Sequence, residues 1–165
     1  MEIERKFLLD APPDGLDEHP SKRLEQGYLA IDPAGAEVRI RRKDDETTMT
    51  VKTGMGLVRG EEEWALDPEH FDRLWPLTGD RQVVKTRYFV PLDDGLTAEV
   101  DIYDGDLDGL VTAEIEFPDE ATALAFEVPA WMGRDVTEDP RYGNRVLAVE
   151  GIPSEPAPSD VSAPR

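Results

Sequence analysis

Charged residues recur at alternate positions in several stretches of the chain, and their types suit phosphate and divalent-metal chemistry. Arginine binds phosphoryl oxygens through paired hydrogen bonds, lysine binds them as a point charge, and carboxylate oxygens hold Mg²⁺ or Mn²⁺. The cations in these stretches are Lys6, Arg39, Arg41, Lys52, Lys85 and Arg87. The carboxylates are Glu2, Glu4, Glu61, Glu63, Glu99, Asp101, Glu114 and Glu116. Brought together, the two sets would bind a phosphate chain and the metal ions that neutralise it.

Two-residue periodicity predicts that β-strands carry these residues, because alternate side chains of a strand share one face. Arg39 and Arg41, for example, lie opposite Val38 and Ile40. A single strand of this kind is more often the solvated side of an ordinary sheet. Its repetition in nearly every predicted strand indicates one shared charged face. The predicted strands cover residues 1–9, 24–31, 37–42, 47–53, 61–66, 83–91, 97–103 and 111–117.

Short connections between these strands favour an antiparallel meander that closes on itself. We therefore expect an α+β, mainly β fold: an eight-stranded antiparallel β-barrel, or tunnel, with a charged lumen. Buried charges need partners, and a metal-bound phosphate chain would supply them. A few helices would cover the outward apolar faces. They are predicted from Asp67-Pro68 through Trp75, from Pro118 through Phe126, and from Asp139-Pro140 towards Val149.

Residues 1–150 are predicted to form one domain, since 165 residues are too few for two ordinary ones. Residues 151–165 are rich in Pro, Ser and Ala and are predicted to be a disordered tail. The glycine-containing segment 54–60 lacks the spacing of a phosphate-binding loop and is predicted to be a flexible connection.

The composition excludes several functional classes. The chain has no cysteine, which excludes disulfides, thiolate zinc sites and a cysteine nucleophile. Its 18 basic and 37 acidic residues give a net charge of −19, whose field repels nucleic acid and anionic lipid. No apolar run is long enough to span a bilayer. We expect a cytoplasmic protein with no nucleic-acid or membrane partner, whose anionic substrate enters as a metal complex.

The segment Glu2-Ile3-Glu4-Arg5-Lys6 resembles the ExExK motif of the CYTH domain, or triphosphate tunnel metalloenzyme, family, in its short bacterial form. Other segments follow in the order that this family shows, and the resemblance covers residues 1–149. These segments are Glu37-Val38-Arg39-Ile40-Arg41, Thr50-Val51-Lys52, Glu61 to Glu63, Lys85-Thr86-Arg87-Tyr88, Glu99-Val100-Asp101, Ala113-Glu114-Ile115-Glu116 and residues 136–144.

The resemblance implies a tunnel that binds triphosphate-bearing small molecules with Mg²⁺ or Mn²⁺. It places the metal on Glu2, Glu4, Asp101, Glu114 and Glu116. It places the substrate on Lys6, Arg39, Arg41, Lys52, Lys85 and Arg87, with Lys6, Arg39, Arg41 and Lys85 as the catalytic set. Glu61, Glu63 and Glu99 would orient the cations, and Tyr28 would partly plug the tunnel. Some relatives carry a C-terminal lysine in the site; here only Arg141 and Arg145 are near, so that role is unassigned.

The implied reaction is metal-dependent hydrolysis of inorganic triphosphate to diphosphate and phosphate. Water would attack in line without a covalent intermediate, and Lys6 with a nearby carboxylate would position it. Alternatives within the family are an activity like that of class IV adenylyl cyclases and a thiamine or nucleoside triphosphatase. A non-catalytic polyphosphate- or nucleotide-binding module is a further alternative. A mouth closed by Tyr28 favours a substrate made only of phosphate, while monomer and homodimer both stay open.

Overall fold

The structure is a computed structural model that describes residues 2–53 and 60–154. Its frame is one antiparallel sheet in the order β5-β4-β3-β2-β6-β7-β8-β1-β9. The strands are β1 (Ile3–Leu8), β2 (Ser21–Ile31), β3 (Glu37–Lys43), β4 (Glu46–Thr53), β5 (Gly60–Ala65), β6 (Gln82–Pro91), β7 (Thr97–Tyr103), β8 (Val111–Phe117) and β9 (Arg134–Asp135). The helices are α1 (Pro68–Leu74), α2 (Glu120–Ala125) and α3 (Asn144–Glu150). The predicted α+β, mainly β class with few helices is confirmed.

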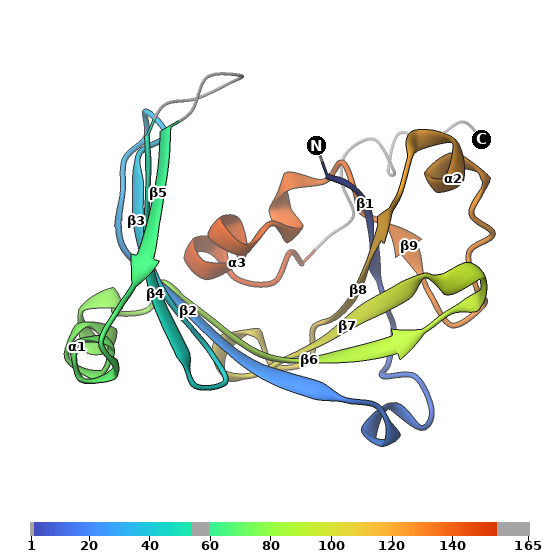
Figure 1. The fold of residues 1–165 in the computed structure, drawn as a ribbon, viewed down its shortest axis with the longest axis horizontal. Helices are drawn as coiled ribbons and strands as arrows, with labels where there is room; N and C mark the ends of the chain where they lie inside the picture. The colour runs from blue at the N-terminus through green and yellow to red at the C-terminus, as the bar shows by residue number, and fades with distance from the viewer. Residues whose placement is uncertain (1, 54–59, 155–165) are drawn as a thin grey trace.

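The sheet bends into a U in Figure 1. β3, β4 and β5 form one wall, β2 and β6 run along the base, and β8 and β1 stand in the opposite wall. Helix α3 lies between the two walls. We call the inner side of the U the concave face and the other side the outer face.

The predicted barrel is approximated rather than closed. Nine strands are present instead of eight, and β5 and β9 form the two edges of the sheet in the described residues. The ninth strand, which the sequence did not predict, pairs Asp135 with Phe7 and Arg134 with Leu8. β9 therefore occupies the edge of β1 with which β5 would have to pair for the barrel to close.

An apolar core packs on the outer face of β1, β7 and β8. Its buried members include Phe7, Val100 and Ile115, and α2 covers it through Ala123. The rings of Phe117 and Phe126 meet edge to face with centroids 5.3 Å apart. Burying each large apolar side chain stabilises the fold by about 1.5–3 kcal/mol, so this cluster fixes the strands that carry most of the predicted acidic residues.

A second cluster packs α3 onto the concave face. Leu147 and Ala148 of α3 belong to the same buried group as Tyr28, Val83 and Tyr103 of the sheet. The helix therefore fills part of the U with apolar contacts. The charged residues of the concave face are left around it.

The helix starts follow the sequence closely. The Asp67 side chain accepts a hydrogen bond from the Glu69 amide (2.8 Å) ahead of α1, with Pro68 as the first helical residue. The Asp119 side chain caps α2 in the same way by accepting from the Thr122 amide (2.7 Å). No helix in the described residues is long and apolar enough to cross a membrane.

The third predicted helix is divided. A 3₁₀ turn, η5 (Pro140–Tyr142), comes first, and α3 begins only after Gly143. Gly143 is extended, with φ −72° and ψ 150°, so the helical hydrogen-bond pattern cannot pass through it. The prediction of one continuous helix from Asp139-Pro140 was therefore wrong in this detail. The predicted disorder of residues 155–165 and the predicted flexibility of residues 54–59 concern residues outside the described ones.

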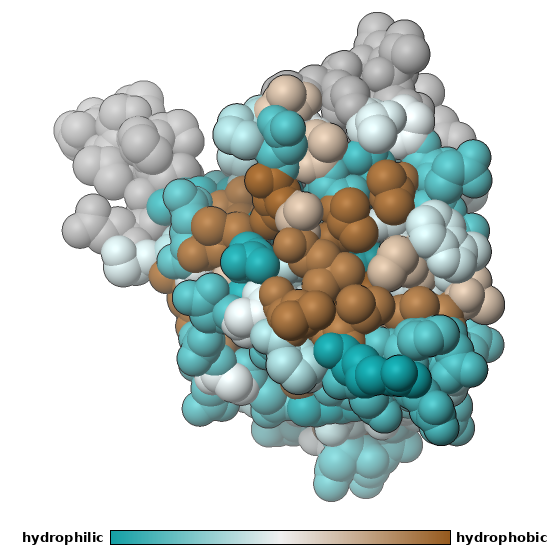
Figure 2. All heavy atoms as spheres, turned by 90° about the vertical axis from the view of Figure 1, so that its left-hand side faces the viewer, coloured by the Kyte–Doolittle hydropathy of each residue, from teal (hydrophilic) through white to brown (hydrophobic). Residues whose placement is uncertain are grey.

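Apolar side chains gather on the outer surface of the β3–β5 wall, as Figure 2 shows. Ile40, Met49 and Trp64 are cross-strand neighbours there. Trp64 is 46% exposed, and Leu77 is 64% exposed. The periodicity placed Trp64 on the correct face. It could not show that α1 leaves the end of that face uncovered.

Replacing Gly133 with alanine should destabilise the protein. A Cβ atom at Gly133 would lie 2.2 Å from the Leu8 carbonyl oxygen, a backbone atom that cannot move without disturbing β1. We expect a loss of about 1–3 kcal/mol in the free energy of unfolding, measured by urea denaturation. Gly143→Ala is the matched control, because its Cβ would come no closer than 3.4 Å to another residue. Equal stability of the two variants would contradict the close approach of Gly133 to β1.

Candidate active site

Strand register places the predicted charged residues on a single face. Direct cross-strand partners share a face, and the pairs Lys6–Glu114, Glu114–Glu99 and Arg87–Asp101 join β1, β8, β7 and β6. Across β2, the same face continues into β3, β4 and β5. There the pairs are Gln26–Arg41, Tyr28–Arg39, Arg39–Thr50, Thr50–Glu63 and Lys52–Glu61. This is the concave face of Figure 1, as the presence of α3 against Tyr28 and Tyr103 requires.

A buried ion-pair network holds the base of this face. Asp101 is fully buried and accepts from Arg87 Nε (2.8 Å) and Arg87 Nη2 (2.9 Å). Its Oδ2 atom also lies 2.8 Å from Lys85 Nζ. Arg87 reaches Glu99 (2.9 Å) and Glu114 (3.2 Å) as well. One arginine therefore ties together three carboxylates from two strands.

The network keeps its members charged despite burial. Burial opposes ionisation of Asp101, yet Lys85 and Arg87 together lower its pKa below the usual value. Burial likewise opposes the charge on Lys85, but Tyr103 and Asp101 raise the pKa of its ammonium. Lys85 Nζ lies 5.2 Å from the Tyr103 ring centroid, which adds a cation–π contact. Near neutral pH, both partners are ionised.

The C-terminal segment contacts two of the predicted catalytic lysines. Lys6 Nζ donates to the Tyr142 carbonyl (2.6 Å) and lies 3.8 Å from Glu114 Oε1. Lys85 Nζ lies 3.4 Å from Asn144 Oδ1, the first residue of α3. The sequence did not single out Asn144 or the Tyr142 carbonyl. The spacing of residues in this segment does not indicate that the chain folds back onto the concave face.

The wall formed by β3, β4 and β5 carries cations that no described carboxylate neutralises. Arg41 and Lys52 are partly exposed on the concave face, and neither side chain has an ion pair or hydrogen bond with any residue in the described part of the chain. Arg39 beside them lies 3.7 Å from Glu37. In a chain with 37 acidic residues, cations without carboxylate partners are ready to receive an anion.

The carboxylates of β1 and β8 suit a divalent metal by their chemistry. Burial raises the pKa of Glu4, and the neighbouring charges of Glu114 and Glu2 raise it further. Such crowding of hard oxygen donors is what Mg²⁺ or Mn²⁺ would relieve. As they stand, no three acidic or histidine side chains among residues 2–53 and 60–154 are grouped closely enough to hold an ion. The donor set fits the metal, whereas Asp101 already has both oxygens engaged by Lys85 and Arg87.

The remaining predicted residues have mixed surroundings. Tyr28 is 1% exposed beneath α3, and its hydroxyl accepts a hydrogen bond from Gln26 Nε2 (2.9 Å). Glu63 accepts from Thr50 (2.9 Å), and neither Glu63 nor Glu61 forms an ion pair with a described residue. Arg141 pairs with Asp139 (2.7 Å). The structure therefore brings most of the predicted residues to one face. On β6, β7 and β8 the charges pair with one another, whereas the β3–β5 wall carries Arg41 and Lys52 without such partners among the described residues, and we call it the positive wall.

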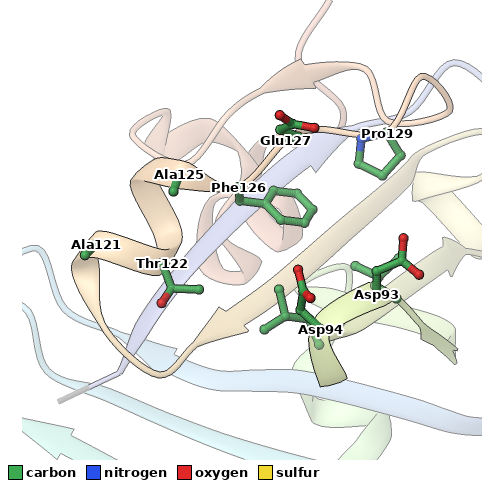
Figure 3. Close-up of a pocket in the computed structure, with 10 residues that line it drawn as sticks. Asp93, Asp94, Ala121, Thr122, Ala125, Phe126, Glu127 and Pro129 are labelled. Carbon is green, nitrogen blue, oxygen red and sulfur yellow. The ribbon is translucent and has the colours of Figure 1, made fainter.

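A groove lies elsewhere, between α2 and the turn η3 (Asp93–Gly95). It encloses about 600 Å³, and Figure 3 shows Phe126 and Thr122 beside Asp93 and Asp94. None of its lining residues belongs to the predicted charged set. The groove is therefore separate from the candidate active site.

A bent antiparallel sheet whose concave face sets crowded carboxylates opposite cations without partners among the described residues suits a tunnel-type protein for a polyanion and metal ions. Known proteins carry the same plan. The chain is 45% identical to the inorganic triphosphatase of Nitrosomonas europaea over 148 residues, which cover 90% of this chain and 97% of that protein. It is 35% identical to the inorganic triphosphatase of Acetivibrio thermocellus over 151 residues, covering 88% and 92% of the two chains.

Solved structures agree with these relatives. The crystal structure of the inorganic triphosphatase NE1496 matches with a TM-score of 0.78 and 43% identity over 90% of this chain and 94% of that one. HpAC1 from Hippeastrum, 17% identical with a TM-score of 0.53 over 75% of this chain and 83% of that one, shares the fold. No family model matches the chain. The identities to the curated relatives are decisive: the chain belongs to the CYTH, or triphosphate tunnel metalloenzyme, family.

Proposed function

We propose that this protein hydrolyses inorganic triphosphate to diphosphate and phosphate in a metal-dependent reaction on the concave face. The observation that carries the proposal is the positive wall of Arg41 and Lys52, which have no partner among the described residues, beside Arg39. The inorganic triphosphatases from N. europaea and A. thermocellus support the choice of substrate.

The positive wall binds the phosphate chain. Arg39 and Arg41 grip phosphoryl oxygens through their forked donors, and Lys52 adds a point charge. Lys85 from the base of the U and Lys6 from the β1–β8 wall reach the same chain once it displaces the Asn144 and Tyr142 contacts. Their positive charges stabilise the charge that develops on the phosphoryl oxygens in the transition state.

Glu2, Glu4, Glu114 and Glu116 would hold Mg²⁺ or Mn²⁺. The metal would supply a Lewis acid that neutralises phosphoryl oxygens. Asp101 keeps Lys85 and Arg87 in position, since both of its oxygens already accept from them. Arg87 in turn holds Glu99 and Glu114 close to the ligand set.

Phosphate release from a panel of inorganic triphosphate, ATP and thiamine triphosphate tests the substrate. We expect inorganic triphosphate to be preferred, since Tyr28 is buried and packs with α3 at the base of the U, where a nucleobase or thiazole would need room. Cyclic AMP from ATP would instead indicate a cyclase. Saturable binding without phosphate release would indicate a binding module.

Removing divalent metal should abolish the activity. In excess EDTA we expect phosphate release to fall to background, and added Mg²⁺ or Mn²⁺ should restore it, because the proposed reaction needs the metal as a Lewis acid at the crowded carboxylates. In an assay with Mg²⁺, calcium-saturated EDTA is the matched control, because EDTA binds Ca²⁺ more tightly than Mg²⁺ and would leave Mg²⁺ free. Full turnover in excess free EDTA would reject the metal-dependent mechanism.

A further inference from the structure

Glu37 is a buried carboxylate whose role neither the charged-residue pattern nor the metal set explains. It begins β3 on the concave face and is 8% exposed. Its Oε2 atom has no hydrogen-bond partner in the described residues. The nearest cation, Arg39 Nη1, lies 3.7 Å away, too far for a hydrogen bond. A buried acceptor left unused in this way needs a donor from outside the protein.

The groups around Glu37 belong to the wall that is proposed to bind the phosphate chain. Glu37 is the direct cross-strand partner of Lys52, and Arg39 follows it on the same face. Arg39 is the cross-strand partner of Tyr28. The Tyr28 hydroxyl already accepts from Gln26, while burial and then the charge of Glu37 raise its pKa. Tyr28 therefore keeps its proton and is a second donor or orienting group at this position.

A fixed carboxylate among phosphate-binding cations repels phosphoryl oxygens. It attracts a group that carries a proton, and in a hydrolase the group that must lie next to the terminal phosphoryl is water. Several other carboxylates on the concave face are already engaged by protein groups. Arg87 engages Glu99, Asp101 and Glu114. The Glu63 carboxylate accepts a hydrogen bond from the Thr50 hydroxyl. Lys6, which the sequence placed beside the water, is a cation that donates to the Tyr142 carbonyl.

We propose that Glu37 is the general base of the reaction and that its Oε2 atom accepts a hydrogen bond from the attacking water. This inference rests on the proposed function and adds the residue that activates the nucleophile. The water oxygen forms a bond to the terminal phosphorus, and the bond from that phosphorus to the bridging oxygen breaks. One proton of the water passes to Glu37, diphosphate leaves with the bridging oxygen, and Glu37 later returns the proton to solvent.

Two variants of Glu37 test the assignment through kcat and KM. Glu37→Gln keeps the size of the side chain but cannot accept the proton, so kcat should fall by about 10²- to 10⁴-fold with little change in KM. Glu37→Ala should fall similarly and regain activity in added formate, which supplies a carboxylate to the vacated space. Formate should not rescue Glu37→Gln. Glu25→Gln is the matched control, because Glu25 pairs with Arg42 on the outer face and should leave kcat unchanged.

Binding of a triphosphate analogue with methylene groups in place of both bridging oxygens separates a base from a structural residue. Removing the negative charge beside the terminal phosphoryl should tighten binding of this analogue to Glu37→Gln by roughly tenfold, measured by calorimetry. A residue that merely held Arg39 in place would weaken binding when changed. Wild-type kcat in Glu37→Gln, absence of formate rescue in Glu37→Ala, or weaker analogue binding would each overturn the assignment. Failure of the wild-type protein to release phosphate would overturn both the proposed function and the base.

Discussion

Replacing Arg41 with alanine is expected to lower kcat/KM for inorganic triphosphate by about 10²- to 10³-fold, as removal of a donor to a developing oxyanion does. Arg41 projects onto the concave face without an ion-pair or hydrogen-bond partner in the described residues. Its removal breaks no internal contact of that kind. The free energy of unfolding should therefore change by less than about 0.5 kcal/mol. Steady-state phosphate release and urea denaturation measure the two effects.

The next residue along the strand is the matched control. Arg42 points to the outer face, where it lies 2.6 Å from Asp72 and stacks 4.3 Å from the Phe71 ring centroid. Arg42→Ala should lower the free energy of unfolding by about 1–2 kcal/mol through the loss of these contacts and leave kcat/KM nearly unchanged. The two neighbours should thus show opposite patterns. If Arg41→Ala kept its activity, the positive wall would not be the phosphate site.

The alternation that separates Arg41 from Arg42 explains why so much of the charged face was predictable. Side-chain direction in a strand depends only on parity, so each strand with a clear boundary assigns its residues to a face without knowledge of its neighbours. Every predicted cation and carboxylate that the structure describes obeys this rule. Glu37 obeys it too, because it lies two residues before Arg39 and therefore shares parity with Arg39 and Arg41.

Contacts made by the C-terminal segment were not predictable in the same way. Asn144 meets Lys85, and the Tyr142 carbonyl meets Lys6, across separations of 59 and 136 residues. These contacts depend on the break at Gly143 and on α3 entering the U, which no local pattern encodes. Closure of the sheet failed as a prediction for a related reason. β9 is only two residues long, so it shows no periodicity, yet it takes the edge of β1.

Asp101 illustrates what a charge pattern leaves open. The family resemblance places it among the metal ligands, and in the structure its two oxygens accept from Lys85 and Arg87. Parity identifies the face of a carboxylate and not its partner. The partner depends on which long side chains of the neighbouring strand can reach it, and only the register of β6 against β7 decides that.

Asp101→Ala should be the most destabilising of the substitutions considered, with a loss of about 3–5 kcal/mol in the free energy of unfolding, because it leaves two buried cations without their shared partner. Lys85 is 5% exposed, so water cannot replace the lost carboxylate. Phosphate release should also fall below detection, since Arg87 would no longer be held beside Glu99 and Glu114. Urea denaturation and phosphate release measure the two losses.

A control substitution and a double variant test whether the loss of stability comes from the ion pairs of Asp101 or would follow any substitution on the concave face. Glu116 lies on the same face but is exposed, so Glu116→Ala should change stability by less than about 0.5 kcal/mol. The double variant Lys85→Ala, Asp101→Ala should be more stable than the sum of the two single losses predicts, because the second change removes a cation that the first left unpaired. Additive losses would mean that Asp101 and Lys85 do not depend on each other. In that case the low pKa of Asp101 would have to come from Arg87 alone, and Lys85 would be free to move onto the substrate.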